Sequence, residues 1–458
     1  MRIAIWGTGK FYEKYKKRFS AKHEIITLID NNALENVRRI DGYPVITPSQ
    51  IDVNTIDAIV ILVKNNEIIR EQIISLGLSS DCDIYDYRDV DDLCGEYFNF
   101  YDLRKATEKK RLLVFTPGLN STGAQNMMFH ALTVVRNDYE IVVISKNDGE
   151  LRQLFVDNKV SVLIKEQWQK ESKILLSMLD WSDLLFANTI WLSHDLEFIA
   201  QCGKPILWWL HESGFHFDVD MESMRHVLNM KNVQPYAVSN IVRERFSPLM
   251  DNSSKIKILL FGVDDFATST SKHEKIVFSM IGHVHYIKGY DIFLRAVDSL
   301  PDFYRKRAKF LIVGGGEFDS ESRKILNRYE EVSYLGKIEN SCISEVYEMS
   351  DVVICCSRED SMSVSAVEGF MNQKIVVASD HAGISAYMTN EYDGYVMRNE
   401  DVEQLVRIIK TIIDSTEEAM TQMRQHGRRI YENYFTMDSF KDNMKLALKK
   451  CLELEDEI

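Results

Sequence analysis

The sequence lacks the segments that mark export, membrane spanning or nucleic-acid binding. Its first apolar run, Ile3–Trp6, is far shorter than the apolar core of a signal peptide, so we expect no export. No stretch approaches the roughly 18 consecutive apolar residues of a membrane span, so any membrane contact should be peripheral. The formal net charge of -14 opposes attraction to phosphate-rich polymers, and we expect no nucleic-acid partner.

Cysteine pairs and metal motifs are also missing. The chain has 7 cysteines but no Cys-x-x-Cys pair of the kind that binds zinc or exchanges disulfides. No Asp-x-Asp element stands at the end of a predicted strand. We therefore expect a protein of the reducing cytoplasm, free or at the inner membrane face, that uses no metal ion and no cofactor.

What the sequence does have is an alternation of short apolar runs and amphipathic helical segments. Its 458 residues exceed the roughly 250–300 residues of a single hydrophobic core, so we expect about three domains. Runs such as RIAIW, AIVILV, EIVVIS, PILWW and DVVICC are typical of strands buried on both faces. Parallel sheets covered by helices follow from this alternation, and the predicted fold class is α/β.

These predicted strands fall into three groups along the chain. We expect a smaller Rossmann-like accessory domain at residues 1–92 and a linker rich in Lys and Arg at 93–110. Two larger Rossmann-like domains are predicted at 111–270 and 271–436. The remaining residues, 437–458, are expected to form a helix with an acidic end.

A lysine at a predicted helix start is the first candidate for an anion site. In SMIGHVHYIKGYDIFLRAV, a strand is followed by Gly282, a polar loop, Lys288-Gly289 and a helix. The ammonium group of Lys288 would add to the positive end of the helix dipole, which suits a phosphate. The alternative is an ordinary exposed lysine after a turn.

The second candidate is CCSREDSMSVSAVEGF, residues 355–370, where a strand gives way to a loop and a helix. Small residues there would let backbone N–H groups approach a pyrophosphate, and the carboxylate of Glu368 suits the two vicinal hydroxyls of a ribose. The residues at the predicted helix start are Ser361, Met362 and Ser363. The alternative is that Asp360 or Ser361 only caps the helix and that Glu368 is solvated.

A run of glycines after a strand is a third, weaker candidate. In FLIVGGGEFD, Gly314 and Gly315 follow a predicted strand. Glycines allow the backbone to approach a nucleobase or a phosphate closely. A flexible turn between strand and helix explains the same run equally well.

In order and spacing these elements resemble the C-terminal half of family 4 glycosyltransferases, which are retaining enzymes of the GT-B architecture. The family has a Gly, then Lys-Gly, then two acidic residues eight apart, matched here by Gly282, Lys288, Asp360 and Glu368. Where the family often has Arg, this chain has His283, and where it usually has Glu, this chain has Asp360. The resemblance implies that Lys288 balances the leaving phosphate and that Glu368 holds the ribose. It also implies a donor-sugar contact for Asp360 and a substrate-binding position for His283.

The resemblance extends to the predicted domain at 111–270. In RLLVFTPGLNSTGAQNMM, Gly118 and Gly123 lie in a loop that faces the donor's phosphates and sugar in the family. PILWWLHES ends a strand on His211-Glu212, so both side chains should emerge at the carboxyl edge of the sheet, where α/β proteins bind ligands. The resemblance implies that His211 contacts the donor sugar and that the terminal helix packs back on this domain.

The N-terminal segment carries an incomplete dinucleotide fingerprint. Gly7-Thr8-Gly9 follows a strand and Asp30 ends the next one, but the third glycine is missing, so we do not expect NAD binding. A module for packing, or for docking a partner subunit through residues 1–92, fits better. The basic runs EKYKKRF and RKATEKKR could face an anionic membrane or a lipid-phosphate acceptor, although such runs are usually solvated faces.

The sequence therefore predicts transfer of a sugar from a nucleoside diphosphate sugar to a hydroxyl group. The acceptor would be a glycan, a lipid-linked saccharide or a protein, and the reaction would be metal-independent and retain the anomeric configuration. Three rivals stand beside this reading: a non-catalytic glycosyltransferase-like subunit that binds an acceptor protein, a sugar-nucleotide epimerase of the same fold, and an oxidoreductase that works through the first domain.

Overall fold

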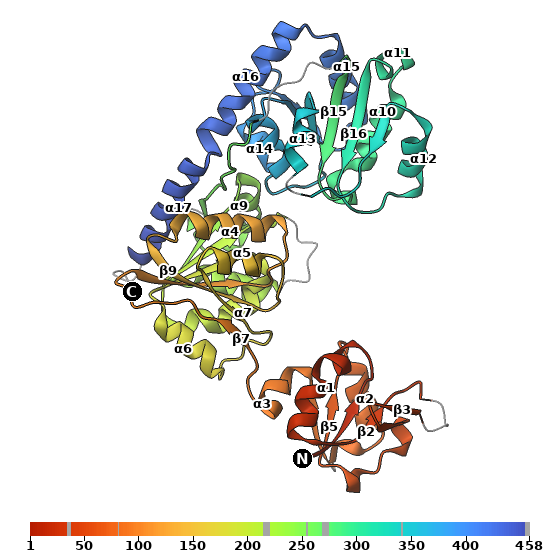
Figure 1. Ribbon diagram of the computed structural model, residues 1–458, viewed down its shortest axis with the longest axis vertical. Coiled ribbons are helices and arrows are strands. Elements are labelled where there is room, and N and C mark those ends of the chain that lie inside the picture. Colours follow the sequence, from red (N-terminus) through yellow and green to blue (C-terminus); the bar gives the residue numbers. More distant parts are fainter. Residues whose placement is uncertain are drawn as a thin grey trace. The chain divides into compact units, whose positions relative to one another are not determined.

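The computed structural model describes residues 1–33, 38–80, 82–213, 220–252, 255–267, 274–339 and 342–453. The chain divides into two compact units (Figure 1). The first unit comprises Met1–Asn99 and Lys165–Ser172, and the second comprises Phe100–Ile164 and Lys173–Ile458. The predicted class, α/β with parallel sheets, is confirmed.

The first unit is built on a sheet with the strand order β3-β4-β2-β1-β5-β6, in which β3 is antiparallel to β4 and the other neighbours are parallel. The strands are β1 Arg2–Trp6, β2 Glu24–Ile29, β3 Arg38–Ile40, β4 Tyr43–Ile46, β5 Ala58–Ile61 and β6 Asp83–Asp86. The helices are α1 Lys10–Lys22, α2 Glu67–Ser75 and α3 Val90–Cys94. Alternate residues of β1 face opposite sides of the sheet, so Ile3 and Ile5 join one core and Ala4 and Trp6 the other.

The segment 165–172 belongs to the first unit although it follows a strand of the second in sequence. Lys165 is almost fully buried, and its Nζ lies 2.5 Å from Oδ2 of Asp91. Arg18 pairs with the other oxygen of Asp91 at 2.7 Å. An ion pair between residues distant in sequence thus ties 165–172 to α3.

The basic runs of the N-terminal segment are largely engaged in ion pairs within the molecule. Lys16 pairs with Glu13 and Asp41, Arg18 pairs with Asp91, and Lys14 pairs with Glu166. In the second run, Arg104 pairs with Asp102. The expected linker, 93–110, is also not free of secondary structure, because it contains β7 Asn99–Tyr101.

The second unit contains two parallel sheets. We call the part built on the first sheet, residues 100–164 and 173–267, the N-lobe, and the part built on the second sheet, residues 274–436, the C-lobe. The N-lobe sheet has the order β14-β13-β12-β11-β8-β9-β10-β7 and the C-lobe sheet has the order β17-β16-β15-β18-β19-β20. Figure 1 shows helices on both faces of each sheet.

The elements of the N-lobe alternate between strands and helices. Its strands are β7, β8 Lys110–Thr116, β9 Tyr139–Ser145, β10 Ser161–Ile164, β11 Leu184–Asn188, β12 Ile206–Leu210, β13 Val233–Ala237 and β14 Lys257–Ile258. Its helices are α4 Gly123–Val135, α5 Leu151–Asp157, α6 Lys173–Trp181, α7 Ser193–Ile199, α8 Met221–Asn229 and α9 Asn240–Phe246. The central strands β8, β11 and β12 are buried almost throughout, as continuous apolar runs predict.

The C-lobe follows the same alternation. Its strands are β15 Ile276–Ile281, β16 Ala308–Val313, β17 Val332–Tyr334, β18 Val352–Cys355, β19 Ile375–Ser379 and β20 Tyr395–Met397. Its helices are α10 Tyr290–Ser299, α11 Asp302–Arg305, α12 Ser320–Arg328, α13 Ile343–Glu348, α14 Val364–Met371, α15 Val402–Asp414 and α16 Glu417–Tyr434. The loops after β15 and β18 lead into α10 and α14. Most of the predicted site residues of the C-lobe lie on these two loops, and Glu368 lies on α14.

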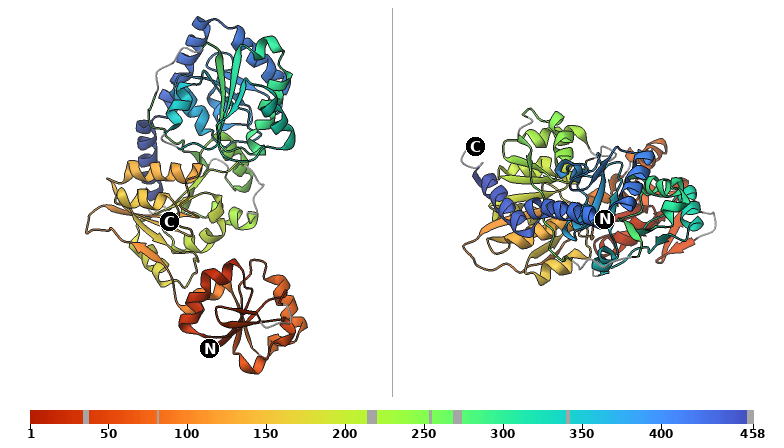
Figure 2. Two further views of the ribbon diagram at one scale, coloured as in Figure 1. Left: turned by 45° about the vertical axis from the view of Figure 1, so that its right-hand side comes forward. Right: turned by 90° about the horizontal axis from the view of Figure 1, so that it is seen from above.

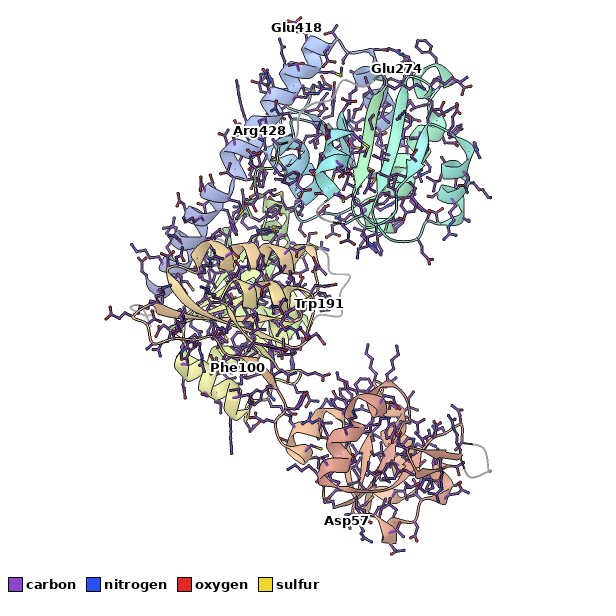
Figure 3. All side chains as sticks on the ribbon, viewed as in Figure 1. Asp57, Phe100, Trp191, Glu274, Glu418 and Arg428 are labelled. Atoms are coloured by element: carbon purple, nitrogen blue, oxygen red, sulfur yellow. The ribbon has the colours of Figure 1, made fainter. Side chains whose placement is uncertain are left out.

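Two chain segments connect the lobes side by side. The backbone N–H of Val263 donates to the carbonyl oxygen of Phe435 at 2.9 Å, and Arg428 of α16, labelled in Figure 3, pairs with Asp265. The last helix, α17 Met437–Leu452, packs against α4 and β12 of the N-lobe, with Phe440 stacked on Trp209. Figure 2 shows α16 and α17, in dark blue, passing from the C-lobe to the N-lobe.

Candidate functional site

A cavity of about 1100 Å³ lies in the second unit and is lined by residues of both lobes. Most of the residues that the sequence singled out border it. These are Gly123, His211, His283, Lys288, Asp360, Ser361, Met362, Ser363 and Glu368. The described lining does not include Gly118, Gly314 or Gly315.

Lys288 is held in the C-lobe wall by an ion pair. Its Nζ lies 2.7 Å from Oδ2 of Asp360, and the side chains of the two residues are 38% and 9% exposed. Burial by itself would lower the pKa of Lys288, but the charge of Asp360 and the hydrogen bond to it outweigh burial and raise the pKa above its usual value. The lysine is therefore a fixed cation at the cavity and not a freely solvated side chain.

The glycine after Lys288 is required by the backbone at this position. Gly289 has a φ of 77°, and a Cβ atom there would lie 2.2 Å from the carbonyl oxygen of Cys356. A side chain at 289 would thus be strained and would also push the loop after β15 away from the loop after β18. Since Lys288 and Asp360 lie on these two loops, Gly289 allows their close approach.

The glycines after β16 lie where two loops of the C-lobe meet. Gly314 has a φ of 143°, and a Cβ atom there would lie 1.6 Å from the carbonyl oxygen of Gly282. The N–H of Val284 donates to the carbonyl oxygen of Gly315 at 2.7 Å. Gly314 and Gly315 therefore bring two loops of the C-lobe together, and Gly282, not they, borders the cavity.

The start of α14 faces the cavity with small side chains. Ser363 caps the helix, because its Oγ accepts the N–H of Ala366 at 3.4 Å. Ser361 reaches the N-lobe, where its Oγ lies 3.2 Å from Oγ of Ser213. The positive end of the α14 dipole thus borders the cavity close to Lys288.

Glu368 lies further along α14 and is bound by a tyrosine of α13. The hydroxyl of Tyr347 donates to Oε2 of Glu368 at 2.6 Å. Burial raises the pKa of Glu368 to about 7, although the hydrogen bond from Tyr347 acts in the opposite direction. Near neutral pH, Glu368 is therefore a carboxyl group that is partly protonated and that borders the cavity.

The loop after β8 places only one of its two glycines at the cavity. Gly123 begins α4 and borders the cavity. The carbonyl oxygen of Gly118 accepts a hydrogen bond from Thr116 at 3.2 Å, and Asn147 donates to the carbonyl oxygen of Pro117 at 2.9 Å. These bonds tie the Gly118 turn to the loop after β9, away from the described lining.

His211 and Glu212 follow β12 and both border the cavity, as their place at the strand end predicts. The imidazole of His211 packs on Trp209, with ring centroids 4.3 Å apart, and its Nε2 has no hydrogen-bond partner among the described residues. Burial lowers the pKa of His211 to about 3, so the ring is neutral at physiological pH. A neutral imidazole suits a hydroxyl group better than it suits a phosphate.

The sequence analysis missed two members of this site. Ser213 contacts Ser361 across the lobes, and Tyr347 binds Glu368. Glu212, which the sequence places at the strand end without a role, borders the cavity beside His211. The contacts of Tyr347 and Ser213 are tertiary, and no local pattern announces them.

The described residues show neither a metal cluster nor a spanning helix. No three His, Cys, Asp or Glu side chains among them are grouped so as to hold a metal ion. None of the described helices is both long enough and apolar enough to cross a membrane.

Family models match both lobes. The family described as "Glycosyl transferases group 1" matches residues 264–430, and "Glycosyl-transferase family 4" matches residues 108–273. Residues 1–82 match the family described as "C2185-like, N-terminal". Each lobe thus matches a different glycosyltransferase family model.

Similar proteins include glycosyltransferases of archaea and bacteria. An uncharacterized glycosyltransferase of Methanocaldococcus jannaschii is 23% identical over 47% of this chain and 56% of its own length. An α-1,4-N-acetyl-D-galactosaminyltransferase of Campylobacter jejuni is 23% identical over 32% of this chain and 41% of its own. The matched regions thus span about half of the length of these relatives or less.

Solved structures share the fold over about three quarters of the chain. The Anabaena protein Alr3699/HepE, crystallised with UDP and glucose, has a TM-score of 0.64 and 18% identity, covering 74% of this chain and 99% of that one. Sucrose-phosphate synthase of Thermosynechococcus elongatus has a TM-score of 0.58 and 13% identity, covering 75% and 99%. At these identities the likeness shows the fold alone, which is GT-B.

Proposed function

We propose that the second unit transfers a sugar from a nucleoside diphosphate sugar to a hydroxyl acceptor, with retention of configuration and without a metal ion. The observation that carries this proposal is the fixed cation Lys288 beside the start of α14 in one cavity wall. A pyrophosphate placed there would meet the ammonium group and the positive end of the helix dipole together. Both are in place before charge develops on the leaving group, which is how preorganised dipoles lower a barrier.

The remaining residues of the cavity fit the other parts of such a donor. Glu368 borders the cavity on α14 beyond the helix start and would accept hydrogen bonds from the ribose hydroxyls. The neutral His211 would contact a hydroxyl of the sugar, and His283 and Met362 would flank the donor. Asp360 would orient Lys288 toward the diphosphate and border the sugar.

The reaction is a front-face substitution, as the family resemblance implies. The bond between the anomeric carbon and the phosphate oxygen breaks, and a bond from the same carbon to the acceptor oxygen forms on the same face. The leaving phosphate takes the proton of the acceptor hydroxyl. Lys288 and the N–H groups at the start of α14 stabilise the charge on that phosphate, which is the task a divalent metal has in other enzymes.

The setting of this activity is part of the proposal. The acceptor would be a glycan, a lipid-linked saccharide or a protein, and the protein would act in the cytoplasm or at the inner membrane face. The first unit, with the Rossmann-like domain expected at 1–92, would serve as an accessory module for a partner subunit or for peripheral membrane contact.

A thermal-shift screen tests the donor class directly. UDP, GDP, ADP and dTDP, each alone and as a nucleotide sugar, should include at least one ligand that raises the melting temperature, because a ligand that binds the folded state stabilises it by mass action. Release of the nucleoside diphosphate from the matching nucleotide sugar should then proceed in the presence of EDTA. If no nucleotide of the panel shifts the transition at millimolar concentration, the proposed donor site is refuted.

A further inference from the structure

Glu212 is a partly exposed carboxyl group in the N-lobe wall of the cavity. Its Oε2 accepts two backbone N–H groups, from Ile190 at 3.1 Å and from His211 at 3.2 Å. No Lys, Arg or His of the described residues forms an ion pair with it. Burial raises the pKa of Glu212 to about 7, against the effect of the two backbone hydrogen bonds.

The backbone that holds Glu212 is strained. Thr189, which precedes Ile190, has a φ of 78° and a ψ of 160°, a region that residues with a side chain rarely adopt. Such a conformation is costly and persists only where the surroundings enforce it. Here the N–H of Thr189 donates to the carbonyl oxygen of Trp209 at 3.0 Å, and its own carbonyl oxygen accepts the indole N–H of Trp208 at 2.8 Å. This loop points the N–H of Ile190 at Glu212.

Two unfavourable features therefore coincide at one carboxyl group. Desolvation of a carboxyl group that has no cation is costly. The strained backbone of Thr189, whose neighbour Ile190 donates to Glu212, adds to that cost. Strain and a carboxyl group without a cation that coincide at a cavity wall indicate a ligand contact rather than a packing role.

The chemistry of the wall indicates which part of a ligand would bind here. A carboxyl group repels a diphosphate but accepts hydrogen bonds from neutral hydroxyls. The next residue, Ser213, contacts Ser361 at the start of α14, where the diphosphate of the proposed donor would lie. The group that follows the diphosphate in a nucleotide sugar is the sugar itself.

We propose that Glu212 binds a hydroxyl group of the donor sugar from the N-lobe side of the cavity. This inference rests on the proposed function, because it requires a nucleotide sugar in the cavity. Oε2 is fixed by the two backbone N–H groups, and the second oxygen receives the sugar hydroxyl. Glu212 would thus contribute to recognition of the sugar but not to recognition of the nucleoside diphosphate.

Glu212→Gln tests this role, since it keeps the size of the side chain and removes its charge. The affinities of UDP and UDP-glucose, UDP-galactose and UDP-N-acetylglucosamine, and of GDP and GDP-mannose, are measured by isothermal titration at pH 8, where the carboxylate predominates. Loss of a hydrogen bond to a charged group should weaken the nucleotide sugar about tenfold or more while the matching nucleoside diphosphate keeps its affinity. Glu222→Gln, a change at an exposed residue outside the cavity, should alter neither affinity.

The stability of the same variant separates a binding role from a structural one. Because no cation of the described residues offsets the desolvation of this carboxyl group, Glu212→Gln should leave the melting temperature unchanged or raise it. Equal losses for a nucleoside diphosphate and its sugar, unchanged affinity for both, or a lower melting temperature would each overturn the assignment. Failure of every nucleotide to bind the unaltered protein would instead refute the proposed function as a whole.

Discussion

Tyr347→Phe is the most informative single change at the donor site. It removes the hydroxyl that donates to Oε2 of Glu368 at 2.6 Å and keeps the ring, which is fully buried and packs near Phe266. The hydrogen bond from Tyr347 favours the charged form of Glu368, and its loss should raise the pKa of that carboxyl above the present value of about 7. The variant is therefore expected to fold and to hold Glu368 in its neutral form at pH 7.

The size of the effect follows from the protonation equilibrium. A hydrogen bond worth about 1.5 kcal/mol to a charged group changes that equilibrium about tenfold. The charged fraction of Glu368 at pH 7 would fall from about one half to about one tenth. Ribose hydroxyls donate to the charged form of Glu368. Nucleotide affinity should therefore be highest above the pKa that Glu368 has in the free protein, and it should fall as the pH drops through that pKa. We expect about fivefold weaker UDP binding at pH 7 and little change at pH 9.

Isothermal titration of UDP and 2′-deoxy-UDP at both pH values measures this. The loss of affinity that Tyr347→Phe causes at pH 7 should be smaller for 2′-deoxy-UDP, because that ligand lacks one of the two hydroxyls that Glu368 would bind. Tyr304→Phe is a matched control, since it removes a hydroxyl that donates to Asp414 at 2.8 Å on the surface, away from the cavity. Equal penalties for the two nucleotides, or a loss that does not depend on pH, would refute the placement of the ribose at Glu368.

Three further changes test other parts of the molecule. Lys288→Ala should abolish transfer and leave the circular dichroism spectrum intact, and near-normal turnover would exclude Lys288 from the phosphate site. Activity should survive excess EDTA, and loss that manganese or magnesium restores would contradict charge compensation by Lys288 and α14. Lys165→Met should lower the free energy of unfolding of the first unit by about 3–5 kcal/mol in urea titrations, because it removes a buried partner of Asp91. Lys14→Met, at an exposed pair with Glu166, should cost about 1 kcal/mol or less.

The sheets could be predicted because buried parallel strands have a clear sequence pattern. RIAIW became β1 Arg2–Trp6 and PILWW led into β12 Ile206–Leu210, each nearly as expected. It was harder to predict to which compact unit each segment of the chain belongs. The place of 165–172 in the first unit depends on the pair between Lys165 and Asp91, residues that are far apart in sequence and that no local periodicity connects.

The site could be predicted to the extent that it depends on loops at strand ends. Lys288, Asp360 and Glu368 follow strands whose carboxyl ends share one edge of the C-lobe sheet, so their approach followed from the fold and the family resemblance. The sequence did not indicate that Lys288 and Asp360 form an ion pair, or that Gly314 packs on Gly282. Those facts depend on distances between loops, which spacing along the chain does not determine.

The carboxyl groups at the cavity are held in different ways, and this arrangement bears on charge balance. Asp360 is paired with Lys288, whereas Glu368 is held by a tyrosine hydroxyl and Glu212 by backbone N–H groups. Burial raises the pKa of both glutamates to about 7, so both accept a proton readily near neutrality. A diphosphate that enters would therefore meet a fixed cation near the α14 start and two weakly charged carboxyls, those of Glu212 and Glu368. Partly charged carboxyls repel a diphosphate less than fully charged ones do, and their charged form accepts hydrogen bonds from hydroxyl groups, so this distribution suits an anionic ligand with a sugar at each end of its diphosphate.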